Sequence, residues 1–259
     1  MTAADVVAVL LAGMAAGTMN AVVGSGTLVS FPVLLFVGLP PVTANISNTI
    51  GLVLGSVAGA WGYRRELAGQ RRRVVVLGAA SLVGGLTGGA LLLVLPPQLF
   101  RSVVPALILL ALVLVVVQPR LARLVAARSS ARGGDAPGAG ATLGSAVFAT
   151  GIYGGYFGAA QGIVLLGVMG VLLDEDLHRV NAIKNVLVGL VNLTAALFFA
   201  GMWALGLASV SWPAAALLSV GALIGGLVGG RVGRLIPPAA LRALIVTVGV
   251  VAIAWLVLA

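Results

Sequence analysis

Two glycine-rich interruptions of apolar sequence carry many of the polar side chains that could bind a solute. The first, residues 17–32, reads GTMNAVVGSGTLVSFP, and the second, residues 151–162, reads GIYGGYFGAAQG. An unpaired backbone N–H or C=O costs several kcal/mol in hydrocarbon, so such breaks survive only against protein or a water-lined cavity. A helix that restarts after each break would aim free N–H groups and its positive dipole end at one point. That arrangement suits an anion.

The candidate binding residues are the glycines and polar residues at these breaks, together with amides on the apolar segment that follows each break. From the first half of the chain they are Asn20, Gly24, Ser25, Gly26, Thr27, Asn45 and Asn48, and from the second half Tyr153, Tyr156, Gln161, Asn181, Lys184, Asn185 and Asn192. Serine, threonine and asparagine also serve helix packing in membranes. Their coincidence with the two breaks favours binding.

Lys184 is the only lysine in the chain and the candidate for a charge that attracts the solute. It follows Asn181 at i+3 and has Asn185 beside it. A second interpretation stays open, because Lys184 lies within a turn or two of a loop. Its amine could then extend to lipid headgroups instead of binding a solute.

The composition predicts a polytopic helical membrane protein. Of the 259 residues 61% are apolar and only 8% are charged, and the mean hydropathy is +1.19. Apolar runs near the length of a membrane span recur throughout. The net charge of +9 gathers in short loops, without the basic face interleaved with aromatics that nucleic-acid binding needs. Without cysteine and with one histidine, His178, the chain offers no multi-histidine metal site, and we expect no cofactor.

The apolar runs divide into about ten helical segments. Residues 6–39 predict two helices that meet at the glycine break, of which the second, 27–39, is too short to cross a core of about 30 Å. Whether this pair crosses or re-enters the membrane is left open. No basic residue precedes the first apolar run, so we expect no cleaved signal peptide. Spans are expected next at 42–63, 74–95 and 99–117, followed by a low-complexity linker at 118–141.

Landmarks repeat in the same order beyond the linker. GSGT at 24–27 corresponds to GAAQ at 158–161, and GGLTGG at 84–89 corresponds to GGLVGG at 225–230. Two tandem halves, residues 1–117 and 142–259, therefore share one design. We assign the glycine pairs to close helix packing, which small residues at this spacing permit.

The basic residues orient the two halves. The loop at 64–73 holds five arginines, so we take it as cytoplasmic. Counting spans from it places further segments inside at 118–141, 174–184 and 231–242, and others outside at 96–101 and 201–210. Arg101 is then the only basic residue outside. Equivalent loops lie on opposite sides, so we predict inverted repeats, each with a broken helix pair and three spans, whose breaks face each other near mid-membrane.

The predicted spans contain no carboxylate that could carry protons. Asp174, Glu175, Asp176 and His178 are interpreted as a solvated cytoplasmic turn, with a proton or metal site as the weaker alternative. Export of an anion from a cell that is negative inside needs no coupling ion, since the potential supplies about 2.3 kcal/mol per charge per 100 mV. Import would need one, and Na⁺ held by backbone carbonyls at the breaks is then the candidate.

Three stretches resemble one family of transporters. They are AGxxNAxxGxGxxxxFPxLL at 16–35, PPVTANISNTIG at 40–51 and GIYGGYFGAAQG at 151–162. Together they resemble the sulfite exporter TauE/SafE family, also called the toluenesulfonate uptake permeases. The resemblance implies a bacterial inner-membrane carrier of small sulfur-containing anions such as sulfite, thiosulfate, sulfoacetate and other organosulfonates. Members of the family more often have Thr-Ser within the segments that here read ISN at 46–48 and IKN at 183–185. The resemblance therefore implies the fold and the transport activity more strongly than it implies the substrate.

We therefore predict an all-α, multi-pass transporter that exports or facilitates a small anion by alternating access at a midplane site. Its partners are that anion and the lipid bilayer, with a second copy of the chain as a further candidate and no nucleic acid. An enzyme would need convergent acid, base, nucleophile or metal groups that the predicted spans lack. An accessory or assembly membrane protein without transport is the remaining alternative.

Overall fold

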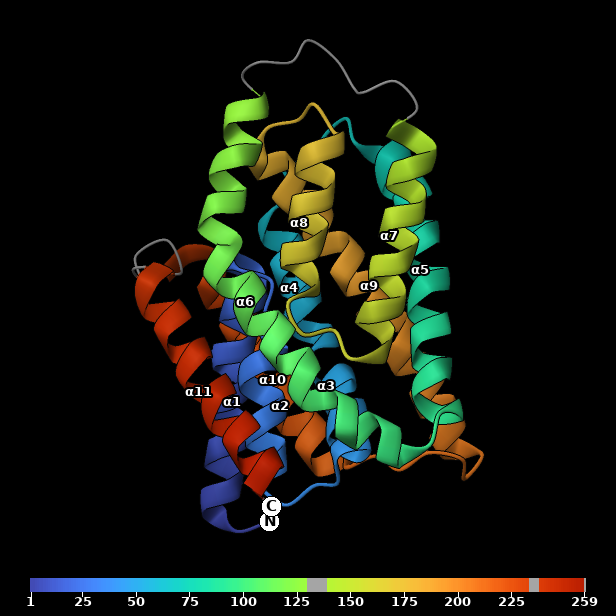
Figure 1. Cartoon of the computed structure of the whole chain (residues 1–259), viewed down its shortest axis with the longest axis vertical. Helices are drawn as coiled ribbons and strands as arrows, with labels where there is room; N and C mark the ends of the chain where they lie inside the picture. The colour runs from blue at the N-terminus through green and yellow to red at the C-terminus, as the bar shows by residue number, and fades with distance from the viewer. Residues whose placement is uncertain (130–138, 233–237, 259) are drawn as a thin grey trace.

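The computed structural model describes residues 1–129, 139–232 and 238–258, which form α-helices and short turns without a strand in those ranges. The helices run roughly along one axis of the molecule (Figure 1). They are α1 (Ala3–Val22), α2 (Thr27–Phe36), α3 (Pro41–Gly51), α4 (Val53–Gly62), α5 (Arg71–Val94), α6 (Pro97–Ser129), α7 (Ala139–Tyr156), α8 (Gln161–Leu172), α9 (Leu177–Ala204), α10 (Trp212–Val232) and α11 (Pro238–Leu258). Because α3 and α4 form one candidate span, Pro41–Gly62, the described chain has the ten helical segments that were predicted.

Within the described residues, six helices are long and apolar enough to cross a membrane: α1, the α3–α4 span, α5, α6, α9 and α10. Large apolar side chains point outward along α5 and α6, among them Val76, Val83, Leu110 and Val116. Soluble proteins rarely expose contiguous apolar surface on this scale. The predicted all-α, multi-pass membrane fold is therefore confirmed.

Both predicted helix breaks are present, between α1 and α2 and between α7 and α8. The outer ends of α1 and α2 lie at the end of the molecule that carries the N-terminus, and those of α7 and α8 lie at the opposite end (Figure 1). At 1.5 Å per residue, α2 is about 15 Å long and α8 about 18 Å, each shorter than a hydrocarbon core of about 30 Å. The two turns therefore lie inside the bundle.

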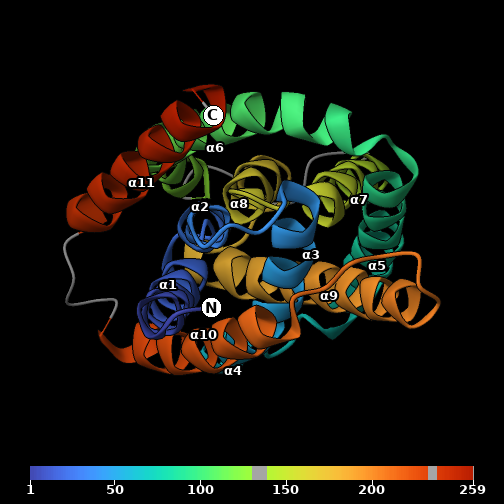
Figure 2. The same ribbon diagram turned by 90° about the horizontal axis from the view of Figure 1, so that it is seen from below.

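The short helices occupy the interior. Figure 2 shows α2, α8 and α3 enclosed by the longer helices, with α6 and α11 along one side and α9 and α10 along the other. Most side chains of α2 are buried, including Phe31 and Leu34. The helix ends at Phe36 rather than at the predicted residue 39, because Gly38 adopts a φ of +91° and the N–H of Leu39 bonds back to Leu34.

The two glycine pairs bring helices into close contact, as predicted. GGLTGG lies on α5, where Gly88 faces the backbone of Ile152 on α7. GGLVGG lies on α10, where Gly225 faces the backbone of Met14 on α1. The first helix of each half thus packs on the glycine-rich helix of the other half. The inverted repeat itself stays a prediction, and this reciprocal packing agrees with it.

Replacing Gly88 by leucine should destabilise the bundle. A Cβ at Gly88 would lie 2.7 Å from the backbone nitrogen of Tyr156, closer than real Cβ atoms approach, so α5 and α7 must separate. We expect a loss of about 3 kcal/mol, at the upper end for overpacking, measured as a lower Tm in detergent. Gly144→Leu on α7 is the control, because a Cβ at Gly144 has no neighbour within 4 Å. Equal melting of the two variants would contradict the packing role.

The loop before α5 and the turn before α9, both predicted to be cytoplasmic, lie together at the end of the molecule opposite the N-terminus (Figure 1). There Glu175 forms ion pairs with Arg73 and with Arg179, the latter at 3.1 Å. Arg179 also donates to the carbonyl of Ala68 at 3.1 Å. The turn predicted to be simply solvated therefore binds the first turn of α5, and the Glu175 side chain is only 13% exposed. The described residues hold no cluster of three or more His, Asp or Glu that could bind a metal.

The predicted linker is partly helical. α6 continues to Ser129 and α7 begins at Ala139, so both ends of the segment 118–141 are helix. Residues 130–138 of this linker lie outside the described residues, as do residues 233–237 of the loop predicted inside at 231–242.

Candidate functional site

The two helix breaks contact each other in the interior of the bundle. The N–H of Gly162, in the first turn of α8, donates to the carbonyl of Gly24 at 3.2 Å. Gly24 has a φ of +86°, a conformation that favours glycine. A Cβ on Gly24 would lie 2.8 Å from the Cα of Gly162, so the two chains touch backbone to backbone. The predicted meeting of the breaks is thus seen as a direct contact.

Two of the predicted binding residues stabilise the backbone of the breaks. The Asn20 side chain accepts a hydrogen bond from the N–H of Gly26 at 2.9 Å. The Tyr153 hydroxyl donates to the carbonyl of Ala159, next to Ala160, which adopts a φ of 59°. The polar atoms used in these bonds position the breaks.

The amides of α3 hold both breaks in place. Asn45 donates to the backbone carbonyl of Tyr156 at 2.9 Å. Asn48 donates to the Thr27 hydroxyl at 3.4 Å and accepts from the Ser30 hydroxyl. Both asparagines are fully buried. Ser30 was absent from the predicted set, although it belongs to the first polar stretch, and its contact with Asn48 depends on the packing of α2 on α3.

Lys184 lies where the two breaks touch. Its side chain is 1% exposed. A Cβ built on Gly24 would lie 3.4 Å from its Nζ, and one built on Gly162 would lie 3.3 Å from its Cδ. The amine therefore lies at the contact between the two halves. The alternative interpretation placed it at the lipid surface, where it does not lie. No ion pair or side-chain hydrogen bond joins it to any residue that the structure describes.

Several predicted residues carry buried polar atoms that lack a hydrogen-bond partner within the described chain. They are Ser25 Oγ, Asn45 Oδ1, Gln161 Nε2 and Asn185 Nδ2. Leaving such a group unpaired costs about 1–3 kcal/mol, so each of these atoms is a candidate to bind a water or a solute. Three of these residues, Ser25, Gln161 and Asn185, can donate hydrogen bonds. With Lys184 these residues are the candidate donors for an oxyanion, and we call Lys184, Ser25, Gln161 and Asn185 the central site.

Three predicted residues make other contacts. Asn192 donates to the Ser56 hydroxyl at 3.0 Å and so joins α9 to α4. The Tyr156 ring packs edge-on against Phe100 at 5.6 Å. Asn181 is half-buried one turn before Lys184, on the side of the basic loops. For these three side chains the structure gives no contact with the central site.

An aromatic cluster lies between the central site and the end that carries the N-terminus. Phe157, just before the second break, packs edge-on against Phe31 at 5.3 Å and against Phe100 at 6.1 Å. All three rings are almost fully buried. Sequence reasoning missed this cluster because single phenylalanines in apolar segments carry no local signal.

Comparison with models of known protein families matches residues 9–256 to one of them, described as sulfite exporter TauE/SafE. The chain belongs to the TauE/SafE family. Searches of curated proteins and of solved structures each give no match. The resemblance of three short stretches is thus confirmed over nearly the whole chain.

Membership in the TauE/SafE family identifies the general activity. It implies a membrane exporter of sulfite or a related sulfur-containing anion, which agrees with the six candidate spans and with a transporter rather than an enzyme. The small anionic solute and the bilayer follow as partners of a TauE/SafE protein.

Proposed function

We propose that this TauE/SafE protein transports sulfite, thiosulfate or an organosulfonate by alternating access at the contact between its two helix breaks. The observation that carries the proposal is the burial of Lys184 against Gly24 and Gly162 without a carboxylate partner in the described chain. An unpaired charge in the interior is costly, and a bound anion supplies the counter-charge.

The surrounding groups fit the same role. The side chains of Ser25, Gln161 and Asn185 offer hydrogen-bond donors, and α2 and α8 begin at the breaks with their positive dipole ends. Among the described residues, no carboxylate forms an ion pair with Lys184. A tetrahedral or pyramidal oxyanion uses several donors converging on one point.

The alternating-access mechanism is supported by closures on both sides of the central site. Toward the end opposite the N-terminus, Glu175 in the turn before α9 pairs with Arg73 at the start of α5, and Arg179 donates to Ala68 in the loop before α5. Toward the other end lies the aromatic cluster of Phe31, Phe100 and Phe157. The helix pair α1–α2 of the first half and the pair α7–α8 of the second half open toward opposite ends of the molecule (Figure 1). This arrangement agrees with inverted repeats that exchange roles. We propose a bacterial inner membrane with the basic end in the cytoplasm, and export driven by the potential.

Flux in proteoliposomes tests this function. With a potassium diffusion potential imposed, we expect sulfite or an organosulfonate to move toward the positive side, and protein-free liposomes to show only leakage. Chloride, acetate and sulfate complete the panel of anions, and equilibrium binding is measured on the same preparations. If no anion in the panel is moved or bound, the transport proposal fails and an accessory role without transport takes its place.

A further inference from the structure

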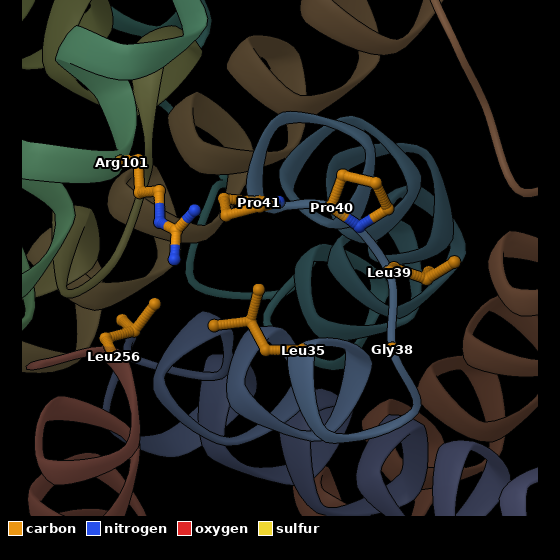
Figure 3. Close-up of a pocket in the computed structure, with 7 residues that line it drawn as sticks. All are labelled: Leu35, Gly38, Leu39, Pro40, Pro41, Arg101 and Leu256. Carbon is orange, nitrogen blue, oxygen red and sulfur yellow. The ribbon is translucent and has the colours of Figure 1, made fainter. Parts of the chain in front are cut away.

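A pocket of about 230 Å³ opens at the end of the molecule that carries the N-terminus. Its walls come from the end of α2, the turn before α3, and parts of α6 and α11 (Figure 3). Leu35, Pro40, Pro41 and Leu256 supply an apolar lining. This pocket is separate from the central site, since the residues that line the two are different.

Arg101 is the one charged residue that lines this pocket. Its guanidinium points into the space between Leu35 and Pro41 (Figure 3). No ion pair or side-chain hydrogen bond joins it to another residue in the described ranges. Arg101 is also the only basic residue that the charge pattern leaves on the outer side. A lone cation in an apolar wall attracts an anion, and an anion with a short apolar tail gains contact with the leucines and prolines as well.

The pocket and the central site lie at the two ends of one short helix. Thr27 begins α2 at the first break, and Leu35 lines the pocket near its other end, about 12 Å away at 1.5 Å per residue. Phe31 lies one turn from Leu35 and packs against Phe157. Phe100, the residue before Arg101, packs against Phe157 too. The aromatic cluster therefore separates the pocket from the central site and contacts the elements of both.

We propose that this pocket is a second anion site, at which Arg101 holds the transported oxyanion on the outer side of the aromatic cluster. This inference rests on the proposed transport function and adds to it a residue that sets affinity from one side of the membrane only. The ligand is a small sulfur oxyanion, with or without a short apolar tail. The phosphate of an anionic lipid offers similar chemistry, so the test separates the two sources.

Sided transport assays on Arg101→Gln test the proposal. Anion exchange is measured in right-side-out and in everted membrane vesicles. From the outer side we expect the half-saturating concentration to rise about tenfold, as for loss of one charged hydrogen bond, with the maximal rate unchanged. From the inner side it should stay the same. Arg101→Lys should recover part of the affinity. Arg120→Gln, an exposed arginine near the other end of α6, is the matched control and should change neither side.

Two further measurements keep failure of the pocket distinct from failure of transport. If the wild type exchanges anions and Arg101→Gln keeps the same half-saturating concentration from the outer side, the pocket proposal alone is wrong. If the wild type exchanges no anion, the transport proposal is wrong. Titration calorimetry with sulfite on Lys184→Met, which lacks the central cation, should reveal weak binding that the Lys184→Met/Arg101→Gln double variant loses. Equal heats in the two variants would overturn the pocket without reference to transport.

Lipid composition separates the two sources of anion. In vesicles of zwitterionic lipid alone, the effect of Arg101→Gln on outer half-saturation should persist. If the effect appears only when anionic phosphatidylglycerol is present, Arg101 binds a lipid headgroup and the proposed solute site is wrong.

Discussion

Replacing Lys184 by methionine should remove anion binding at the central site and abolish transport while leaving the protein folded. Methionine fills similar space with an apolar chain, and replacing a buried charge by an apolar group is often neutral or stabilising. The cation at the contact of the two breaks is lost, however, so the anion loses its counter-charge. We expect affinity to fall by at least about a hundredfold, since truncating a buried charge partner costs 2–5 kcal/mol. Titration calorimetry, flux in proteoliposomes and Tm measure the three quantities.

A neighbouring substitution controls for a general disturbance of α9. Leu187 is fully buried one turn beyond Lys184, and Leu187→Met conserves its volume, so binding should stay within about threefold of wild type. If Lys184→Met binds sulfite as well as Leu187→Met does, Lys184 is not a ligand. The transport proposal would then lose the observation that carries it.

Replacing Gly24 by alanine should impair both stability and transport. The φ of +86° costs an L-residue about 1–2 kcal/mol, and the added Cβ would lie 2.8 Å from the Cα of Gly162. The first break must then move away from α8, which weakens the hydrogen bond between Gly162 N–H and Gly24 C=O. We expect a total loss of about 2–4 kcal/mol in unfolding free energy and at least a tenfold loss in flux.

Gly206→Ala separates backbone strain from the contact between the breaks. Gly206 has a similar φ of +74°, but a Cβ there has no neighbour within 4 Å. Its substitution should show the strain alone, as a smaller fall in Tm with normal flux. If the two variants melt alike and both transport normally, the breaks are not held in tight contact and the central site is wrongly located.

The helical organisation could be predicted because a membrane constrains local sequence strongly. The bilayer requires apolar runs of a set length, and charged residues gather in the loops between these runs. Both breaks and the ten helical segments could therefore be predicted from the sequence. Boundaries were less accurate where local chemistry competes. The α6 helix runs on to Ser129 through a segment predicted as linker, because the alanines, leucines and arginines there also favour helix.

The polar residues could be predicted as a group but not by role. Asn20 and Tyr153 are among the predicted solute ligands, and in the structure each forms a hydrogen bond with the backbone of a break. Asn192 is also among the predicted ligands, and the structure joins it to Ser56 by a hydrogen bond. Their types and spacing were informative, but which atoms remain unpaired depends on every neighbour within 3.5 Å.

The sequence by itself determined that this chain is a polytopic membrane protein with two glycine breaks, one lysine on the segment after the second break and one outlying arginine. Only the tertiary structure decided that Gly24 touches Gly162, that Lys184 is buried at that contact, and that Arg101 points into a pocket at the far end of α2. The physical reason is that chain breaks and charges are local properties, whereas burial and contact arise from the packing of helices far apart in sequence.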